Sequence, residues 1–169
     1  AEKHKDLTDD ERKLLGKRDL EHGSTIHGTQ VLYPSMKSEP TTYYHRSGPL
    51  GDLLDRATTP RNAAIIGLGV GTCAAYFKKG ETVTFYELDE AVVNIAQNLF
   101  TYLKDSPATK KMVLGDARLQ LEKAPNYSYD IILVDAFSSD SIPTHLLTRE
   151  AMALYESKLK PNGRLILHI

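Results

Sequence analysis

The chain has 169 residues, of which 41% are hydrophobic, and this is enough for one globular domain with a single core. Its 21 basic and 22 acidic side chains leave a formal net charge of -1, which does not support a broad basic face for nucleic acid. A single cysteine, Cys73, excludes an internal disulfide and a multi-cysteine metal site.

Both ends of the chain lead us to expect a piece of a longer protein. The sequence begins at Ala1 instead of a methionine, and it stops inside an apolar run, GRLILHI. It has no signal-peptide pattern, and no apolar run approaches the ~20 residues that cross a bilayer. A membrane segment or further strands outside this sequence are open alternatives. We therefore expect either a cytoplasmic protein or the cytoplasmic domain of a membrane protein.

Two segments are predicted before the main domain. Glu11 follows Thr8 by three residues, which is the capping-box pattern and predicts a helix from about Asp9 to Asp19 within an N-terminal helical segment, 1–22. Residues 23–58 mix β-branched and aromatic side chains with prolines and glycines. This composition predicts two or three short strands in a small β-hairpin flap, with a helical turn at its end.

Strands and helices alternate over residues 59–169. The predicted strands are NAAIIGLG, ETVTFYELD, KKMVLGDA, YDIILVDAF and RLILHI, and the predicted helices are VGTCAAYFKKG, EAVVNIAQNLFTYL, RLQLEKA and LLTREAMALYESKL. In the second helix we expect Val92, Ile95, Leu99 and Leu103 to form one apolar stripe. Apolar strands separated by helices predict an α/β fold, a mostly parallel sheet covered on both faces. Right-handed crossovers make this a doubly wound, Rossmann-like domain.

Three glycines, Gly67, Gly69 and Gly71, follow the first strand of this domain. In a doubly wound sheet, ligands bind beyond the carboxyl ends of the strands, where glycine permits a tight turn and a close approach. The spacing is G-x-G-x-G and differs from the G-x-G-x-x-G of dinucleotide binders. The loop predicts a ligand site, and a tight strand-to-helix turn without a ligand is the alternative interpretation.

Acidic residues end the next two strands. Glu87 is placed to accept hydrogen bonds from ribose hydroxyls, and a solvated strand-end acid is the alternative. Asp116 is placed to bind an adenine amino group, with Ala117 leaving room for the ring, although Asp116 could instead cap the following helix. Together with the glycines, these residues predict a nucleoside site. The chain has neither a G-x-G-x-x-G motif nor a P-loop lysine, which argues against a dinucleotide or a triphosphate.

The segments IIGLGVGT, VTFYELDEAVVNIAQ, KMVLGDAR and YDIILVDAF resemble the nucleoside-binding core of class I AdoMet-dependent methyltransferases and polyamine aminopropyltransferases. The LLTREAM helix and the flap segments HGTQVL and YYHRSGPLG are closer to spermidine synthase and its spermidine-synthase-like relatives. The resemblance covers roughly residues 23–169 and includes forms fused behind membrane-spanning segments. It implies a class I methyltransferase-like fold that lacks the last strands, and members of the family often form homodimers.

The resemblance also implies a reaction and a set of site residues. An aminopropyltransferase moves the aminopropyl group of decarboxylated AdoMet to a diamine such as putrescine, with no metal. Asp135 would be the base that takes a proton from the amine, and Asp140 would bind the far ammonium group. Tyr44 would line the diamine channel, and Gln30 would position the aminopropyl or ribose end. Both aspartates have an alternative interpretation as loop or helix-cap acids.

Three departures from the family pattern leave other functions open. Val70 stands where the glycine loop usually carries an aspartate, and Arg46 follows the Tyr-His pair in place of a glutamate. The spacing of Asp135 and Asp140 is five residues instead of three. An AdoMet-dependent methyltransferase acting on a small molecule is therefore one alternative function. A non-catalytic nucleoside-binding domain of a larger, membrane-associated protein is another.

Overall fold

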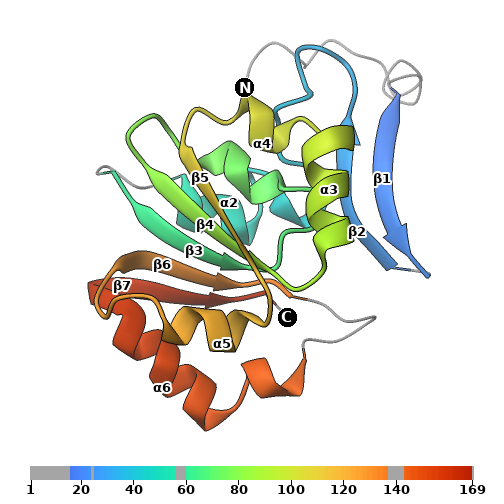
Figure 1. The fold of residues 1–169 in the computed structure, drawn as a ribbon. Coiled ribbons are helices and arrows are strands. Elements are labelled where there is room, and N and C mark those ends of the chain that lie inside the picture. Colours follow the sequence, from blue (N-terminus) through green and yellow to red (C-terminus); the bar gives the residue numbers. More distant parts are fainter. Residues whose placement is uncertain (1–15, 24, 56–59, 137–142, 169) are drawn as a thin grey trace.

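The fold is given by a computed structural model, which describes residues 16–23, 25–55, 60–136 and 143–168 (Figure 1). Its centre is a parallel sheet of five strands in the order β5-β4-β3-β6-β7, with a separate antiparallel pair, β1-β2. The elements are β1 Lys17–His22, β2 Thr25–Val31, η1 Thr42–Tyr44, α2 Pro49–Leu54, β3 Asn62–Ile66, η2 Thr72–Tyr76, β4 Thr82–Glu87, α3 Glu90–Leu99, α4 Tyr102–Asp105, β5 Thr109–Leu114, α5 Ala117–Glu122, β6 Tyr129–Val134, η3 Thr144–Leu146, α6 Arg149–Lys158 and β7 Leu159–Leu167. The predicted doubly wound sheet is confirmed.

The sheet is buried on both faces, as its apolar strands require. Helices α2, α3 and α4 and the 3-10 helix η2 lie on one side, and α5 and α6 lie on the other (Figure 1). Alternate residues of each strand enter the two cores, so that Ile65 packs toward α2 and α3 while Ile66 packs toward α5 and α6. Because helices cover both faces of the sheet, a ligand site is expected at the carboxyl ends of the strands.

Two helix predictions within this domain are wrong in detail. The segment after the glycine loop forms only a five-residue 3-10 helix, η2, instead of a helix that continues to Gly80. Helix α3 buries Val93 and Ala96 against the sheet, whereas Leu99 is 51% exposed. The expected stripe is only partly formed. Val92 and Ile95 pack at the edges of the cores and also line a cavity, and Leu103 is buried on the separate helix α4.

The predicted N-terminal helix is also wrong where the structure describes it. Lys17–Asp19 belong to strand β1, and the rest of the predicted helix lies outside the described residues. Pairing with β2 stabilises the strand, and the Thr29 hydroxyl donates a hydrogen bond of 2.6 Å to the Asp19 carboxylate across the hairpin. Tyr43 and Tyr44 lie on the 3-10 helix η1 and not on a strand. The flap is therefore one hairpin, β1-β2, followed by short helical segments.

A buried ion pair connects the amino ends of the sheet to the helices above it. The Arg61 guanidinium donates to both carboxylate oxygens of Glu81, at 2.7 and 3.0 Å, and also to the backbone oxygens of Leu54 and Tyr76. Both side chains are about as buried as the apolar core around them.

Among the helices that the structure describes, none combines the length and the apolarity needed to span a membrane.

Candidate functional site

A cavity of about 490 Å³ lies at the carboxyl ends of the parallel strands, with residues of the β1-β2 hairpin and η1 in its wall. Its charged and titratable lining is one-sided, since among the described residues it includes five carboxylates, three histidines and no lysine or arginine. The carboxylates are Glu21, Glu87, Asp89, Asp116 and Asp135, and the histidines are His22, His27 and His145. The remaining lining is largely apolar and aromatic, so the cavity favours a ligand that is both cationic and partly apolar.

The glycine loop forms the floor of this cavity through Gly67 and Gly69. Both residues have positive φ angles, +97° and +53°. A Cβ atom on Gly67 would lie 2.4 Å from the backbone oxygen of Asp135, and one on Gly69 would lie 2.7 Å from that of His27. The glycines are therefore needed mainly for the close approach of strand β6 and of the flap. Gly71 does not line the cavity.

Glu87 is held at the end of β4 by two backbone groups. Its Oε2 atom accepts a hydrogen bond of 3.0 Å from the N–H of Leu68 in the glycine loop, and its Oε1 atom accepts one of 2.9 Å from Asp89. These bonds fix the carboxylate at the cavity wall, and each oxygen retains a second acceptor site. The role of Glu87 toward ribose hydroxyl groups stays a prediction.

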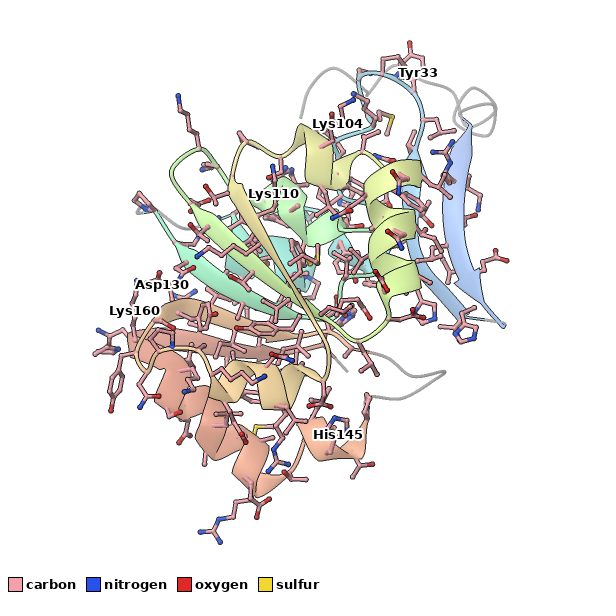
Figure 2. All side chains as sticks on the ribbon, in the orientation of Figure 1. Tyr33, Lys104, Lys110, Asp130, His145 and Lys160 are labelled. Atoms are coloured by element: carbon pink, nitrogen blue, oxygen red, sulfur yellow. The ribbon has the colours of Figure 1, made fainter. Side chains whose placement is uncertain are left out.

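Asp116 caps the following helix, which was one of the two interpretations of this residue, and it also lines the cavity, while its contact with adenine stays a prediction. Its Oδ1 atom caps helix α5 by accepting a hydrogen bond of 3.0 Å from Leu119, while Oδ2 lies 2.9 Å from Nε2 of His145 at the cavity. Figure 2 shows His145 on the short η3 segment close to α5. Burial alone would raise the pKa of Asp116, but the hydrogen bonds from Leu119 and His145 outweigh it and lower the pKa below its ordinary value. Ala117, the next residue, also lines the cavity.

Asp135, at the end of β6, lies between two other side chains. The Tyr44 hydroxyl donates a hydrogen bond of 2.5 Å to its Oδ2 atom, and Nδ1 of His168 lies 2.6 Å from its Oδ1 atom. The Asp135 side chain is only 5% exposed, yet it lines the cavity, as does Tyr44. Burial and the charge of Asp135 raise the pKa of the Tyr44 phenol well above its ordinary value, so that the phenol stays protonated. The structure thus brings the predicted pair Asp135 and Tyr44 into direct contact.

The sequence analysis did not predict His168, which contacts Asp135 directly. In the parallel pairing of β6 with β7, Val134 lies opposite Leu167, so the residues that follow, Asp135 and His168, end side by side. The signal was available in the sequence, since a polar residue follows each of these apolar strands. It becomes readable only when the strand order places β7 next to β6.

Besides Gly71, two further predicted site residues are not part of the described cavity. Gln30 is fully buried, and its amide donates to the Thr101 hydroxyl at 2.8 Å and to the Lys37 backbone oxygen at 2.7 Å. Its Oε1 atom accepts a hydrogen bond from the backbone N–H of Thr101. This geometry connects β2 to the start of α4 and does not support the predicted role in ligand positioning. Asp140 lies outside the described residues, and its role stays a prediction.

The two residues that depart from the family pattern do not line the cavity either. Val70 is buried, and its side chain fills the space that a Cβ atom on Gly28 would need. Arg46 pairs with Glu39 at 3.0 Å and with Asp55 at 2.7 Å, and it lies over the ring of Tyr76. Neither residue adds a charge to the cavity lining.

Metal and thiol chemistry have no described basis in this site. Among the residues with described positions, no three or more His, Cys, Asp or Glu side chains are grouped so that they could hold a metal ion. Cys73 is buried on η2, and burial, with the charge of Asp135, raises the pKa of its thiol well above the ordinary value. The thiol is therefore protonated and a weak nucleophile.

Comparison with known proteins gives evidence on the family of this chain that does not depend on the geometry of the cavity. A family model described as "Spermine/spermidine synthase domain" matches residues 52–168. A "Probable polyamine aminopropyl transferase" of Bifidobacterium longum is 27% identical over 160 residues, which are 93% of this chain and 34% of that protein. A "Polyamine aminopropyltransferase" of Vibrio vulnificus is 35% identical over 112 residues, 63% of this chain and 37% of that protein. The chain thus spans about a third of the length of these curated relatives.

Comparison with solved structures finds a similar fold in a related group of proteins. The crystal structure of a probable spermidine synthase from Corynebacterium glutamicum superposes with a TM-score of 0.69 at 21% identity, covering 84% of this chain and 52% of that one. At this level of identity the likeness concerns the fold.

Proposed function

Because the chain belongs to the spermine/spermidine synthase family, we propose that it transfers the aminopropyl group of decarboxylated AdoMet to a diamine such as putrescine. The observation that carries this proposal is the charge of the cavity, whose described lining has five carboxylates and no lysine or arginine. Both proposed substrates are cations, a sulfonium with an ammonium tail and a protonated diamine. A carboxylate-lined cavity attracts such cations and repels phosphates.

The nucleoside end of the donor fits the outer carboxylates. In the proposed complex, Glu87 accepts hydrogen bonds from the two ribose hydroxyls, and the Asp116 carboxylate accepts one from the adenine amino group. The apolar side chains of Leu88 and Leu146 line the same cavity and would contact the faces of the base. The backbone of Gly67 and Gly69 would pass beneath the sulfur.

The transfer step uses the inner carboxylate. A neutral amine nitrogen of the diamine attacks the carbon bonded to sulfur, so that the new C–N bond forms as the C–S bond breaks. The sulfur keeps the electron pair and leaves as neutral methylthioadenosine, and the product nitrogen remains protonated as a secondary ammonium. Free alkyl amines titrate near pH ~10, so the amine enters protonated and must lose one proton to a base before it attacks. Asp135 lines the cavity and would take that proton, while Tyr44 holds its carboxylate in place.

An AdoMet-dependent methyltransferase is the second candidate, and one observation favours it. The glycine loop presents Val70 to the flap and adds no carboxylate at that position to bind the amine of an aminopropyl tail. AdoMet carries a carboxylate in its tail, to which the imidazole N–H groups of His22 and His27 in the cavity wall could donate hydrogen bonds. The two candidates therefore differ in the donor that the cavity prefers.

The test is calorimetric titration of the chain with decarboxylated AdoMet, AdoMet and methylthioadenosine, followed by mass spectrometry of products formed with putrescine. We expect tighter binding of the decarboxylated donor and formation of spermidine. Asp135→Asn should lower turnover at least 100-fold, at about the scale of a lost general base, while methylthioadenosine still binds. Asp52→Asn, at an exposed position on α2, is the matched control. A preference for AdoMet would favour the methyltransferase, and nucleoside binding without turnover would favour a non-catalytic domain.

A further inference from the structure

His168 is placed behind the carboxylate that faces the cavity. It follows strand β7, and its Nδ1 atom lies 2.6 Å from Oδ1 of Asp135, on the opposite oxygen from the Tyr44 hydroxyl. Its backbone N–H also donates to the Val134 oxygen at 3.0 Å, which fixes the residue to the neighbouring strand. The His168 side chain is 29% exposed, compared with 5% for Asp135, so the imidazole is more accessible to water than the carboxylate.

We propose that His168 is a positioning residue that sets the charge Asp135 presents to the amine substrate. Neutral His168 donates its Nδ1–H to the carboxylate and holds it in place with its negative charge intact. Protonated His168 forms an ion pair with the carboxylate and neutralises it. This inference rests on the proposed function, because it concerns how Asp135 binds and deprotonates an amine.

Protonation of His168 has two effects on Asp135, and both make Asp135 less able to bind and deprotonate the amine. An imidazolium 2.6 Å from Asp135 weakens the attraction of the carboxylate for an incoming ammonium group. It also stabilises the carboxylate against taking a proton, which makes Asp135 a weaker base. The site is therefore expected to bind and deprotonate the amine when His168 is neutral.

We expect His168 to change its protonation state within the pH range in which the protein can be studied. The hydrogen bond with Asp135 raises the pKa of His168 above its ordinary value of 6.5, and partial burial opposes this shift without cancelling it. Among the described residues, titratable groups on η1 and η2 also face the pair. Burial raises the pKa values of Tyr43 and Tyr44, and burial together with the charge of Asp135 raises that of Cys73. These three groups stay neutral while His168 titrates.

The first measurement does not depend on turnover. The imidazole resonance of His168, assigned from the spectrum of His168→Gln, is followed by NMR from pH 5 to 9 in the ligand-free protein. We expect a midpoint above 6.5 in the wild type and a return toward 6.5 in Asp135→Asn. A wild-type midpoint at or below 6.5 would overturn the inference.

The second measurement is the pH profile of kcat/KM for putrescine. Below the His168 midpoint, the wild type should lose about tenfold per pH unit relative to His168→Gln, which keeps a hydrogen-bond donor but carries no charge. The control is His45→Gln, an exposed histidine next to Ser47, which should keep the wild-type profile. If His168→Gln changes the rate equally at every pH, the residue is only structural and the inference fails. If the wild type binds donor but makes no product, the proposed function fails instead, whatever the NMR midpoint.

Discussion

Substituting Gly69 by alanine tests whether contact between the glycine loop and the flap shapes the donor site. Gly69 has a φ angle of +53°, and a Cβ atom there would lie 2.7 Å from the backbone oxygen of His27. A left-handed backbone costs a residue with a Cβ roughly 1–2 kcal/mol. Overpacking against a fixed backbone atom typically adds about 1–3 kcal/mol, because the flap must move away. Gly69→Ala should therefore lower the free energy of unfolding by about 2–5 kcal/mol.

Gly23 provides the matched control. Its φ angle is +63°, close to that of Gly69, but a Cβ atom there would meet nothing within 4 Å. Gly23→Ala should therefore cost only the backbone term, about 1–2 kcal/mol. The difference between the two variants isolates the contact between the loop and the flap.

The assay is urea unfolding followed by far-UV circular dichroism, which suits a chain without tryptophan. Calorimetry with methylthioadenosine then measures the donor site itself. We expect binding to weaken about tenfold or more in Gly69→Ala, the equivalent of 1.4 kcal/mol, and to stay unchanged in Gly23→Ala. Equal destabilisation by the two substitutions, or unchanged binding in Gly69→Ala, would refute the inference that this contact shapes the site.

Three further predictions concern single side chains. Glu81→Gln leaves Arg61 buried without its counter-charge and should destabilise the protein by about 3–5 kcal/mol in urea unfolding at pH 7. Burial opposes ionisation of Glu81, but Arg61 and backbone N–H groups outweigh it and lower its pKa, so the wild type should lose this stability as the pH falls below 4.5. Glu87→Gln removes a charged acceptor and should weaken methylthioadenosine binding by about 1.5–3 kcal/mol in calorimetry. Tyr44→Phe removes the hydrogen bond to Asp135 and should lower kcat about tenfold, with donor affinity unchanged in a steady-state assay.

The fold was largely predictable because the burial of parallel strands leaves a strong pattern. Runs such as NAAII and YDIILV are apolar on both faces, and the structure buries them on both faces. The N-terminal helix failed for the opposite reason. Its capping signal was local, whereas Lys17–His22 form a strand through pairing with Thr25–Val31. The secondary structure of a short polar segment is decided by the strand or helix that it packs against, and this information is absent from its local sequence propensity.

The candidate site was predictable where topology alone brings residues together. The carboxyl ends of parallel strands meet at one edge, so Glu87, Asp116 and Asp135 share a cavity without any knowledge of their side-chain contacts. Gln30 failed because its role depended on which way a flap residue points, and the structure directs it to Thr101. His168 was missed because its place depends on the order of the strands.

The departures from the family pattern have a smaller effect on the cavity than the sequence suggested. Relative to the family pattern, Val70 removes a negative group and Arg46 replaces a negative group with a positive one. The structure places Val70 against Gly28 of the flap and pairs Arg46 with Glu39 and Asp55 outside the cavity. The described lining therefore keeps its negative sign through residues at strand ends, whose positions the sheet dictates. A cavity of that sign attracts cationic ligands more strongly than anionic ones.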